Sequence, residues 1–166
     1  MEDLVSQSTH PGAPSDGGHP IAGVSTSVAA FVGETLRGPA DQARRISSFA
    51  AFESEFGGLA ANRPLGHAIL HFFRNGGVYA LVVRVARIDG ASPTSADFCG
   101  GPGGKTGLHA LEVADLFNLL CLPDTVDPEV LAEALALCRS RRSLLLVDLP
   151  ESIDTPAGAQ AWLSAN

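Results

Sequence analysis

The sequence predicts an α/β fold in which a mainly parallel or mixed β-sheet is flanked by helices. Short apolar runs, of the kind that form strands buried on both faces, alternate along the chain with segments whose apolar residues recur at helical spacing. The 166 residues can bury one hydrophobic core, so we expect residues 21–166 to form a single domain. A composition of 45% hydrophobic and 17% charged residues excludes a disordered chain.

Residues 1–20 are expected to form a flexible tail ahead of this domain. The segment is rich in glycine and proline, and its only large apolar residues after Met1 are Leu4 and Val5. It therefore buries too little surface to offset the entropy lost on ordering. It has neither the basic region nor the apolar core of a signal peptide.

The first half of the domain is expected to contain three strands and two helices. Residues 28–33 form a short apolar run that ends in glycine, which predicts a buried strand, and residues 44–46 are suited to a brief edge strand. The spacing of Phe49, Phe52 and Phe56 predicts a helix with three rings on one face. A second helix starts at Pro64 and stops at the Asn75-Gly76-Gly77 turn, and the β-branched run 78–85 follows as a strand.

The second half is expected to be loop, helix, strand, helix, strand, helix. Residues 87–106 are predicted as a loop, 108–113 as a short helix, and 116–122 and 143–148 as buried strands. Asp127 and Pro128 start the long helix between those strands, and Thr155-Pro156 starts a final helix that runs to Trp162. The predicted inner stripe of the long helix consists of Val130, Leu131, Ala134, Leu135 and Cys138.

The net negative charge of the chain limits the kinds of molecule that it is expected to bind. Eleven Lys and Arg against 18 Asp and Glu leave a net charge of −7, whereas binding to phosphate backbones needs clustered basic residues. We therefore expect neither nucleic acid nor a membrane as a partner. The small basic patches at Arg44-Arg45 and at 139–142 are interpreted as solvated side chains, or as partners for a neighbouring subunit's carboxylates.

No metal or disulfide framework is expected. Cys99, Cys121 and Cys138 are odd in number and contain no CxxC pair. His67 and His71 stand four residues apart on a predicted helix, but position 68 is alanine where the HExxH zinc motif needs glutamate. We interpret both histidines as packed or half-exposed side chains.

Residues 100–106, Gly-Gly-Pro-Gly-Gly-Lys-Thr, are similar to a phosphate-binding loop. On this alternative interpretation Lys105 and Thr106 contact phosphate, Asp148 supports magnesium, and the chain is a small nucleotide-binding α/β protein. The first glycine of the motif is replaced by Cys99, and no convincing strand leads into the loop. We therefore interpret the segment as a flexible glycine-rich connection.

No catalytic set emerges from the other polar residues. The GxSxG turn of a serine hydrolase is absent. Asp148 follows a predicted strand, where ligands bind in open α/β sheets, but it can equally satisfy backbone donors at that strand end. We expect no enzymatic activity, no catalytic residue and no cofactor.

Several segments, in order, resemble the contractile tail sheath family of phages, pyocin-like particles and contractile injection systems. The strongest are GVSTSVAAFVG at 23–33 and LFNLLCLP at 116–123. Weaker ones are Arg37-Gly38-Pro39 and the segments 46–58, 72–85 and 141–148. The resemblance spans residues 20–163.

This resemblance implies a structural subunit with no nucleotide site. Sheath proteins stack as hexameric rings around an inner tube, and their core is subtilisin-like in shape only. The implied partners are other copies or other sheath subunits, together with tail tube or baseplate proteins. The implied location is the cytoplasm of the producing bacterium and then the virion or phage-tail-like particle.

The chain resembles only the N-terminal core portion of that family. The usual N-terminal arm strand is replaced by the Gly/Pro-rich segment 10–20, and the C-terminal part of the domain is truncated relative to the family. Family arms add strands to a neighbour's sheet. We therefore expect that this chain does not build a complete contractile sheath alone, and that it leaves a sheet edge or apolar patch uncovered.

Overall fold

The computed structural model describes residues 27–123 and 125–165. The predicted tail 1–20 and the expected start of the domain at residues 21–26 lie outside the described residues. The elements in chain order are β1 (Ala29–Gly33), β2 (Arg44–Ile46), α1 (Phe49–Phe56), α2 (Pro64–Arg74), β3 (Ala80–Arg84), α3 (Ser95–Cys99), the 3₁₀ helix η1 (Gly107–Val113), β4 (Leu119–Cys121), α4 (Pro128–Arg141), β5 (Leu144–Leu146) and α5 (Pro156–Ala165).

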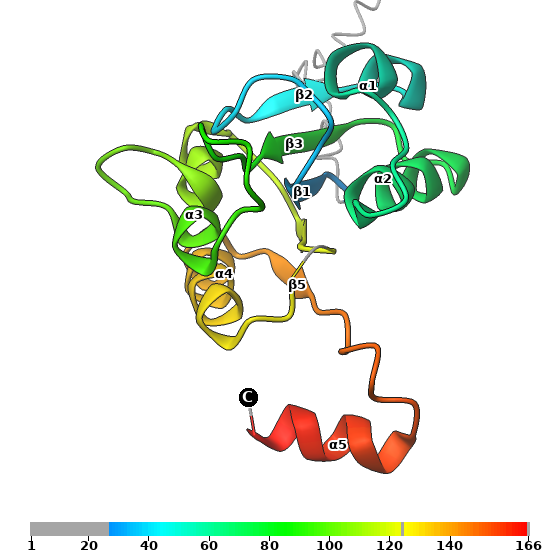
Figure 1. Cartoon of the computed structure of the whole chain (residues 1–166), viewed down its shortest axis with the longest axis vertical. Coiled ribbons are helices and arrows are strands. Elements are labelled where there is room, and N and C mark those ends of the chain that lie inside the picture. The colour runs from blue at the N-terminus through cyan, green and yellow to red at the C-terminus, as the bar shows by residue number, and fades with distance from the viewer. Residues whose placement is uncertain (1–26, 124, 166) are drawn as a thin grey trace, which may run out of the picture.

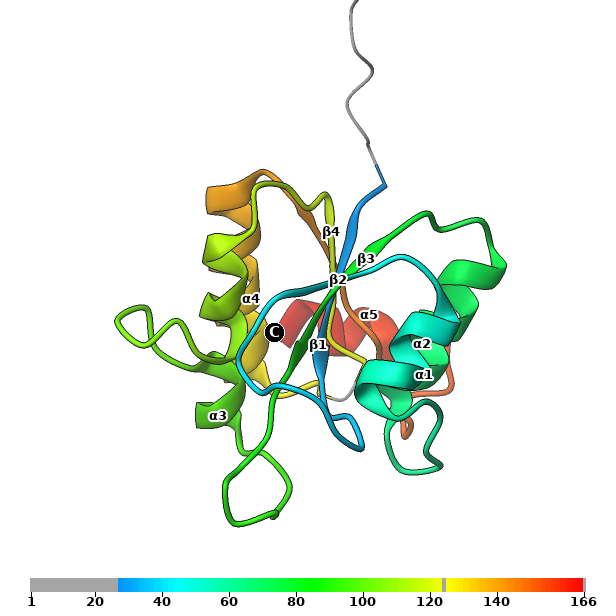
Figure 2. The ribbon, with the colours of Figure 1, turned by 90° about the horizontal axis from the view of Figure 1, so that it is seen from above.

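The five strands form one mixed sheet, which confirms the predicted fold class. The strand order is β2-β3-β1-β4-β5, and among these described strands only β2 is antiparallel to its neighbour. The register aligns Ala29 of β1 with Ala80 of β3 and with Leu119 of β4. Helices lie on both faces of the sheet, with α1 and α2 on one side and α3 and α4 on the other (Figures 1 and 2).

Strand β1 lies at the centre of the sheet and is buried along its whole length. Its side chains alternate between the faces, so Ala29 and Phe31 pack in the core with α1 and α2. Ala30 and Val32 pack in the other core, with η1 and α4. This double burial explains why β1 is apolar throughout and does not alternate with polar residues.

The α1–α2 layer follows the predicted pattern closely. The Ser48 hydroxyl accepts a hydrogen bond from the Ala51 amide at 3.1 Å and caps α1, which ends at Gly57 in a left-handed conformation. The rings of Phe52 and Phe56 are stacked, with their centroids 5.5 Å apart, and both are buried. They pack in the same cluster as Leu65 and Ile69 of α2.

The opposite layer differs from the prediction in two places. Residues 87–106 are not loop throughout, because Ser95–Cys99 forms α3, and the predicted helix 108–113 is a 3₁₀ helix. In α4, Leu137 is buried whereas Leu135 is 40% exposed, so the predicted inner stripe is wrong at position 135. The buried residues Val130, Ala134, Leu137 and Cys138 follow a spacing that turns Leu135 toward β5 and solvent.

The last strand also differs from the prediction. The runs expected as strands at 116–122 and 143–148 pair over Leu119–Cys121 and Leu144–Leu146 only. Strand β5 is an outer strand and is not buried, since Leu144 is 60% and Leu146 is 45% exposed. Beyond it, α5 buries none of its residues and stands at the end of an extended segment (Figure 1).

The strand starts near β5 are tied by one residue, Asn118. Its side-chain Oδ1 accepts a hydrogen bond from the Val28 amide at 3.0 Å, and its backbone carbonyl accepts one from the Leu144 amide at 2.8 Å. The same residue therefore aligns the starts of β1, β4 and β5. Within the described residues, no helix combines the length and apolar character needed to cross a membrane.

Leu120→Ala and Leu144→Ala make the same change on neighbouring strands. We expect Leu120→Ala to lower the free energy of unfolding by about 2–5 kcal/mol, because it opens a cavity in the core. Leu144→Ala should cost less than about 1 kcal/mol, because the side chain is already mostly in water. Urea unfolding followed by circular dichroism measures both, and equal losses would contradict the outer position of β5.

Candidate functional site

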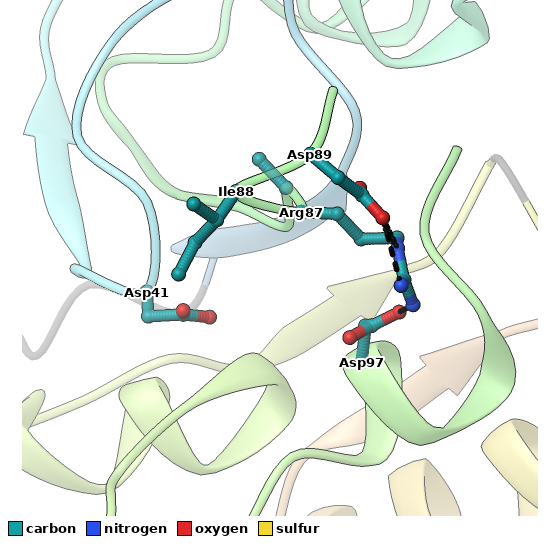
Figure 3. Close-up of a pocket in the computed structure, with 6 residues that line it drawn as sticks. Asp41, Arg87, Ile88, Asp89 and Asp97 are labelled. Atoms are coloured by element: carbon teal, nitrogen blue, oxygen red, sulfur yellow. Dashed lines mark hydrogen bonds and ion pairs between the residues drawn. The ribbon is translucent and has the colours of Figure 1, made fainter. Parts of the chain in front are cut away.

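The carboxyl ends of β1 and β3 open into a polar hollow, the position at which open α/β sheets bind ligands. Its volume is about 480 Å³, and a second hollow of about 270 Å³ adjoins it. Figure 3 shows Asp41, Arg87, Ile88, Asp89 and Asp97 around the larger one. None of these residues is among those that the sequence predicts as site residues.

Arg87 is the central charge of this hollow. Its Nη2 lies 3.0 Å from Asp89 Oδ2, and its Nη1 lies 3.2 Å from Asp97 Oδ2 (Figure 3). Hydrogen bonding from Arg87 lowers the pKa of the Asp89 carboxyl. The pKa of Asp97 is also lowered, first by the Thr94 amide and hydroxyl and then by Arg87. Both carboxylates are thus held ionised by donors that they already contact.

These carboxylates organise the loops around the hollow. Asp97 Oδ2 accepts hydrogen bonds from the Thr94 amide at 2.8 Å and the Thr94 hydroxyl at 2.7 Å, which closes a capping box at the start of α3. Asp41 Oδ1 accepts one from the Gly107 amide at 2.8 Å. The Thr-x-x-Asp spacing at 94–97 is the sequence signal that could have identified α3.

The residues of the phosphate-loop interpretation are not arranged as that motif requires. Lys105 is exposed, with a φ of 50°, and the Thr106 hydroxyl accepts a hydrogen bond from the Gly101 amide at 3.1 Å. Their loop joins α3 to η1, so a helix precedes it where the motif has a strand. Asp148 is exposed just after β5 at the outer edge of the sheet, whereas η1 packs against β1 and β3.

The two histidines of α2 lie at the surface, whereas all three cysteines are at least partly buried. His67 and His71 are exposed on α2, and no group of three or more His, Cys, Asp or Glu able to hold a metal occurs among residues 27–123 and 125–165. Burial raises the pKa of Cys121 to about 12 and raises the pKa of Cys138, so neither thiol is poised as a nucleophile. Both residues lie in apolar segments, which predicts small buried side chains. Cys138 is buried as expected, whereas Cys121 is only partly buried, because β4 has partly exposed residues on either side of Leu120.

One further polar contact escaped the sequence analysis. His109 of η1 places Nδ1 2.6 Å from Glu112 Oε1 and Nε2 3.1 Å from Glu133 Oε1. Because Glu133 belongs to α4, this imidazole joins the 3₁₀ helix to the long helix. A single histidine amid apolar neighbours carries no sequence signal for such a contact.

The apolar surface of the protein gathers at β5. On the side of the sheet with α1 and α2, the helices leave a depression of about 400 Å³, which Leu119, Cys121 and Leu146 line together with Phe72. On the α4 side, a groove of about 370 Å³ lies between α4, β5 and α5. The outer side of β5 pairs with no strand among the described residues. We call Leu144, Leu146 and this unpaired strand side the β5 edge.

Comparison with known proteins identifies the kind of fold. No protein-family model matches the chain, and no curated protein matches it. A solved structure of the anti-feeding prophage helical sheath in its contracted state is similar, with a TM-score of 0.53 and 16% sequence identity. The match covers 95% of this chain and 44% of the sheath chain, so this chain spans less than half of that protein's length. The fold is therefore sheath-like.

The ion pairs of the hollow predict a pH dependence. The pKa values of Asp89 and Asp97 in the folded protein lie below the ordinary value of 3.8. The two ionised carboxylates therefore give their full stabilisation of the folded state at pH values above 3.8. It is lost as the pH falls through the lowered values, when both carboxyls become protonated in the folded state. We expect the urea midpoint of the double variant Asp89→Asn, Asp97→Asn to fall less than that of the wild type between pH 5 and about pH 2.

The control for this titration is Asp154→Asn, which changes an exposed carboxyl in the segment before α5. That variant should follow the wild-type profile. Identical profiles for the wild type and the double variant would show that the hollow's carboxylates do not stabilise the folded state.

Proposed function

We propose that this protein is a structural subunit of a contractile sheath-like assembly, and that it acts by contacting other copies of itself or other sheath subunits. The observation that carries the proposal is the fold that it shares with the subunit of a helical sheath. The assembly would be a phage tail, a bacteriocin or an injection system, made in the bacterial cytoplasm. Tail tube or baseplate proteins are further partners of the proposed role.

The β5 edge supports a role in assembly. An outer strand presents unpaired backbone N–H and C=O groups that an extended segment of another chain can pair with. Natural proteins protect such edges with charges, yet all three residues of β5 are leucines. The adjoining depression beside Phe72 adds apolar surface that a second subunit can bury.

The polar hollow supports a structural role over catalysis. Each of its three carboxylates already accepts a hydrogen bond from a loop amide or from Arg87. The buried thiols have raised pKa values. An active site instead needs groups whose protonation is balanced near the working pH and which are free to meet a substrate.

Leu146→Lys tests the role of the β5 edge. We expect the wild-type protein to self-associate with rising concentration, measured by sedimentation velocity, and the variant to remain monomeric over the same range. Burying one leucine contributes about 1.5–3 kcal/mol, so its replacement by lysine should weaken association by roughly 10- to 100-fold.

Leu59→Lys is the matched control, because Leu59 is 43% exposed, close to the 45% of Leu146. It lies between α1 and α2, away from β5, and should leave association unchanged. A wild-type protein that stays monomeric at every concentration, without added sheath components, would count against the proposed function.

A further inference from the structure

A tight turn after β3 holds one aliphatic side chain out in solvent. Ile88 is fully exposed at the tip of the Arg87–Gly90 turn, which the Gly90 amide closes by donating to the Arg87 carbonyl at 3.2 Å. An isolated exposed isoleucine is ordinary on a protein surface. The turn that carries this one is braced on both sides.

The brace comes from the ion pairs of the polar hollow. Arg87 Nε donates to Asp89 Oδ1 at 3.1 Å and Nη1 donates to Asp97 Oδ2 at 3.2 Å, so the turn is tied to α3 (Figure 3). The Ala91 amide donates to Asp89 Oδ1 at 3.1 Å and holds the other side. A turn held in this way loses little conformational entropy when it binds.

An apolar groove lies beside β5, on the far side of the central strand from β3. The groove between α4, β5 and α5 has a volume of about 370 Å³ and is predominantly apolar. Its lining residues include Leu131, Leu135, Leu144, Val147 and Trp162. Leu135 and Leu144 are 40% and 60% exposed, so the groove is accessible to an entering side chain. Since α5 buries no residue, it closes the groove only loosely.

The surroundings of the turn carry a net negative charge, because the three carboxylates of Asp41, Asp89 and Asp97 outnumber the guanidinium of Arg87 beside Ile88 (Figure 3). Arg139 is exposed one helical turn after Leu135, and Arg142 is exposed at the end of α4 that leads into β5. Two exposed carboxylates, Glu129 and Asp148, adjoin the lining residues Pro128 and Val147. The net negative turn is therefore complementary to the Arg139 and Arg142 end of the groove only.

The sheet order sets the geometry of such a contact. The turn extends from β3 and the groove borders β5, which lie on opposite sides of the central strand β1. The turn and the groove are different surfaces of one chain, so a contact between them is heterologous. Repeating a heterologous contact produces a ring where the rotation closes and a helical filament where it does not.

We propose that the Ile88 turn of one copy inserts into the α4–β5–α5 groove of the next copy, and that this head-to-tail contact links neighbouring subunits. The inference rests on the proposed function as an assembling subunit and names the surfaces involved. It differs from strand pairing at the β5 edge, because it uses side chains and needs no added strand, although Leu144 belongs to both surfaces.

Two complementary variants test the contact. Leu135→Glu blocks the groove and keeps the turn, whereas Ile88→Asp removes the apolar side chain of the turn and keeps the groove. We expect nuclear magnetic resonance signals of residues 87–91 in labelled Leu135→Glu protein to shift on adding unlabelled Ile88→Asp protein. A partner that carries both substitutions should produce no such shift, with binding weakened at least tenfold.

The controls separate this contact from other association. Val78→Asp changes an exposed β-branched residue at the opposite end of β3 and should leave wild-type self-association intact. Circular dichroism checks folding, and Leu163→Glu replaces Leu135→Glu if that variant unfolds.

Equal responses to both partners, or none to either, would overturn the Ile88 contact. If wild-type protein still self-associates in that case, the proposed function stands; a strictly monomeric wild type would overturn both.

Discussion

The central strand β1 is the constraint on which the rest of the structure depends. It is hydrogen-bonded on both sides and buried on both faces, so each of its residues contributes to one of the two cores. A parallel strand in this position needs helical crossovers to cover both faces of the sheet. The order of helices along the chain supplies them, with α1 and α2 before β3 and with α3, η1 and α4 after it.

The two helical layers do not cover the sheet evenly, and this asymmetry leaves β5 open. Helices α1 and α2 share a core with β1, β2 and β3, while α4 covers the other face as far as β5. Leu144 and Leu146 of β5 consequently remain exposed, and the final helix buries none of its residues. Apolar surface concentrated at an outer strand is typical of an interaction site.

Ion pairs and hydrogen bonds between polar side chains hold the loops at the carboxyl end of the sheet in place. Arg87 joins the turn after β3 to α3, Asp41 holds the first residue of η1, and His109 joins η1 to α4. The free energy gained by each exposed pair is small, but together they restrict loops that have few apolar contacts. In the assembly that we propose, such loops would present fixed surfaces to neighbouring subunits.

The sequence alone determined the order and type of most elements, because those signals are local: the phenylalanine spacing of α1, the Asp127 and Pro128 start of α4, and the apolar run of β1. It did not locate the polar hollow, because Asp41, Arg87 and Asp97 are distant in sequence and meet only when β3 and α3 are in place. It also predicted β5 as buried, because a leucine run has the same pattern in a central and an outer strand. Only the tertiary structure decides which strand lacks a neighbour, and hence where the chain exposes its apolar surface.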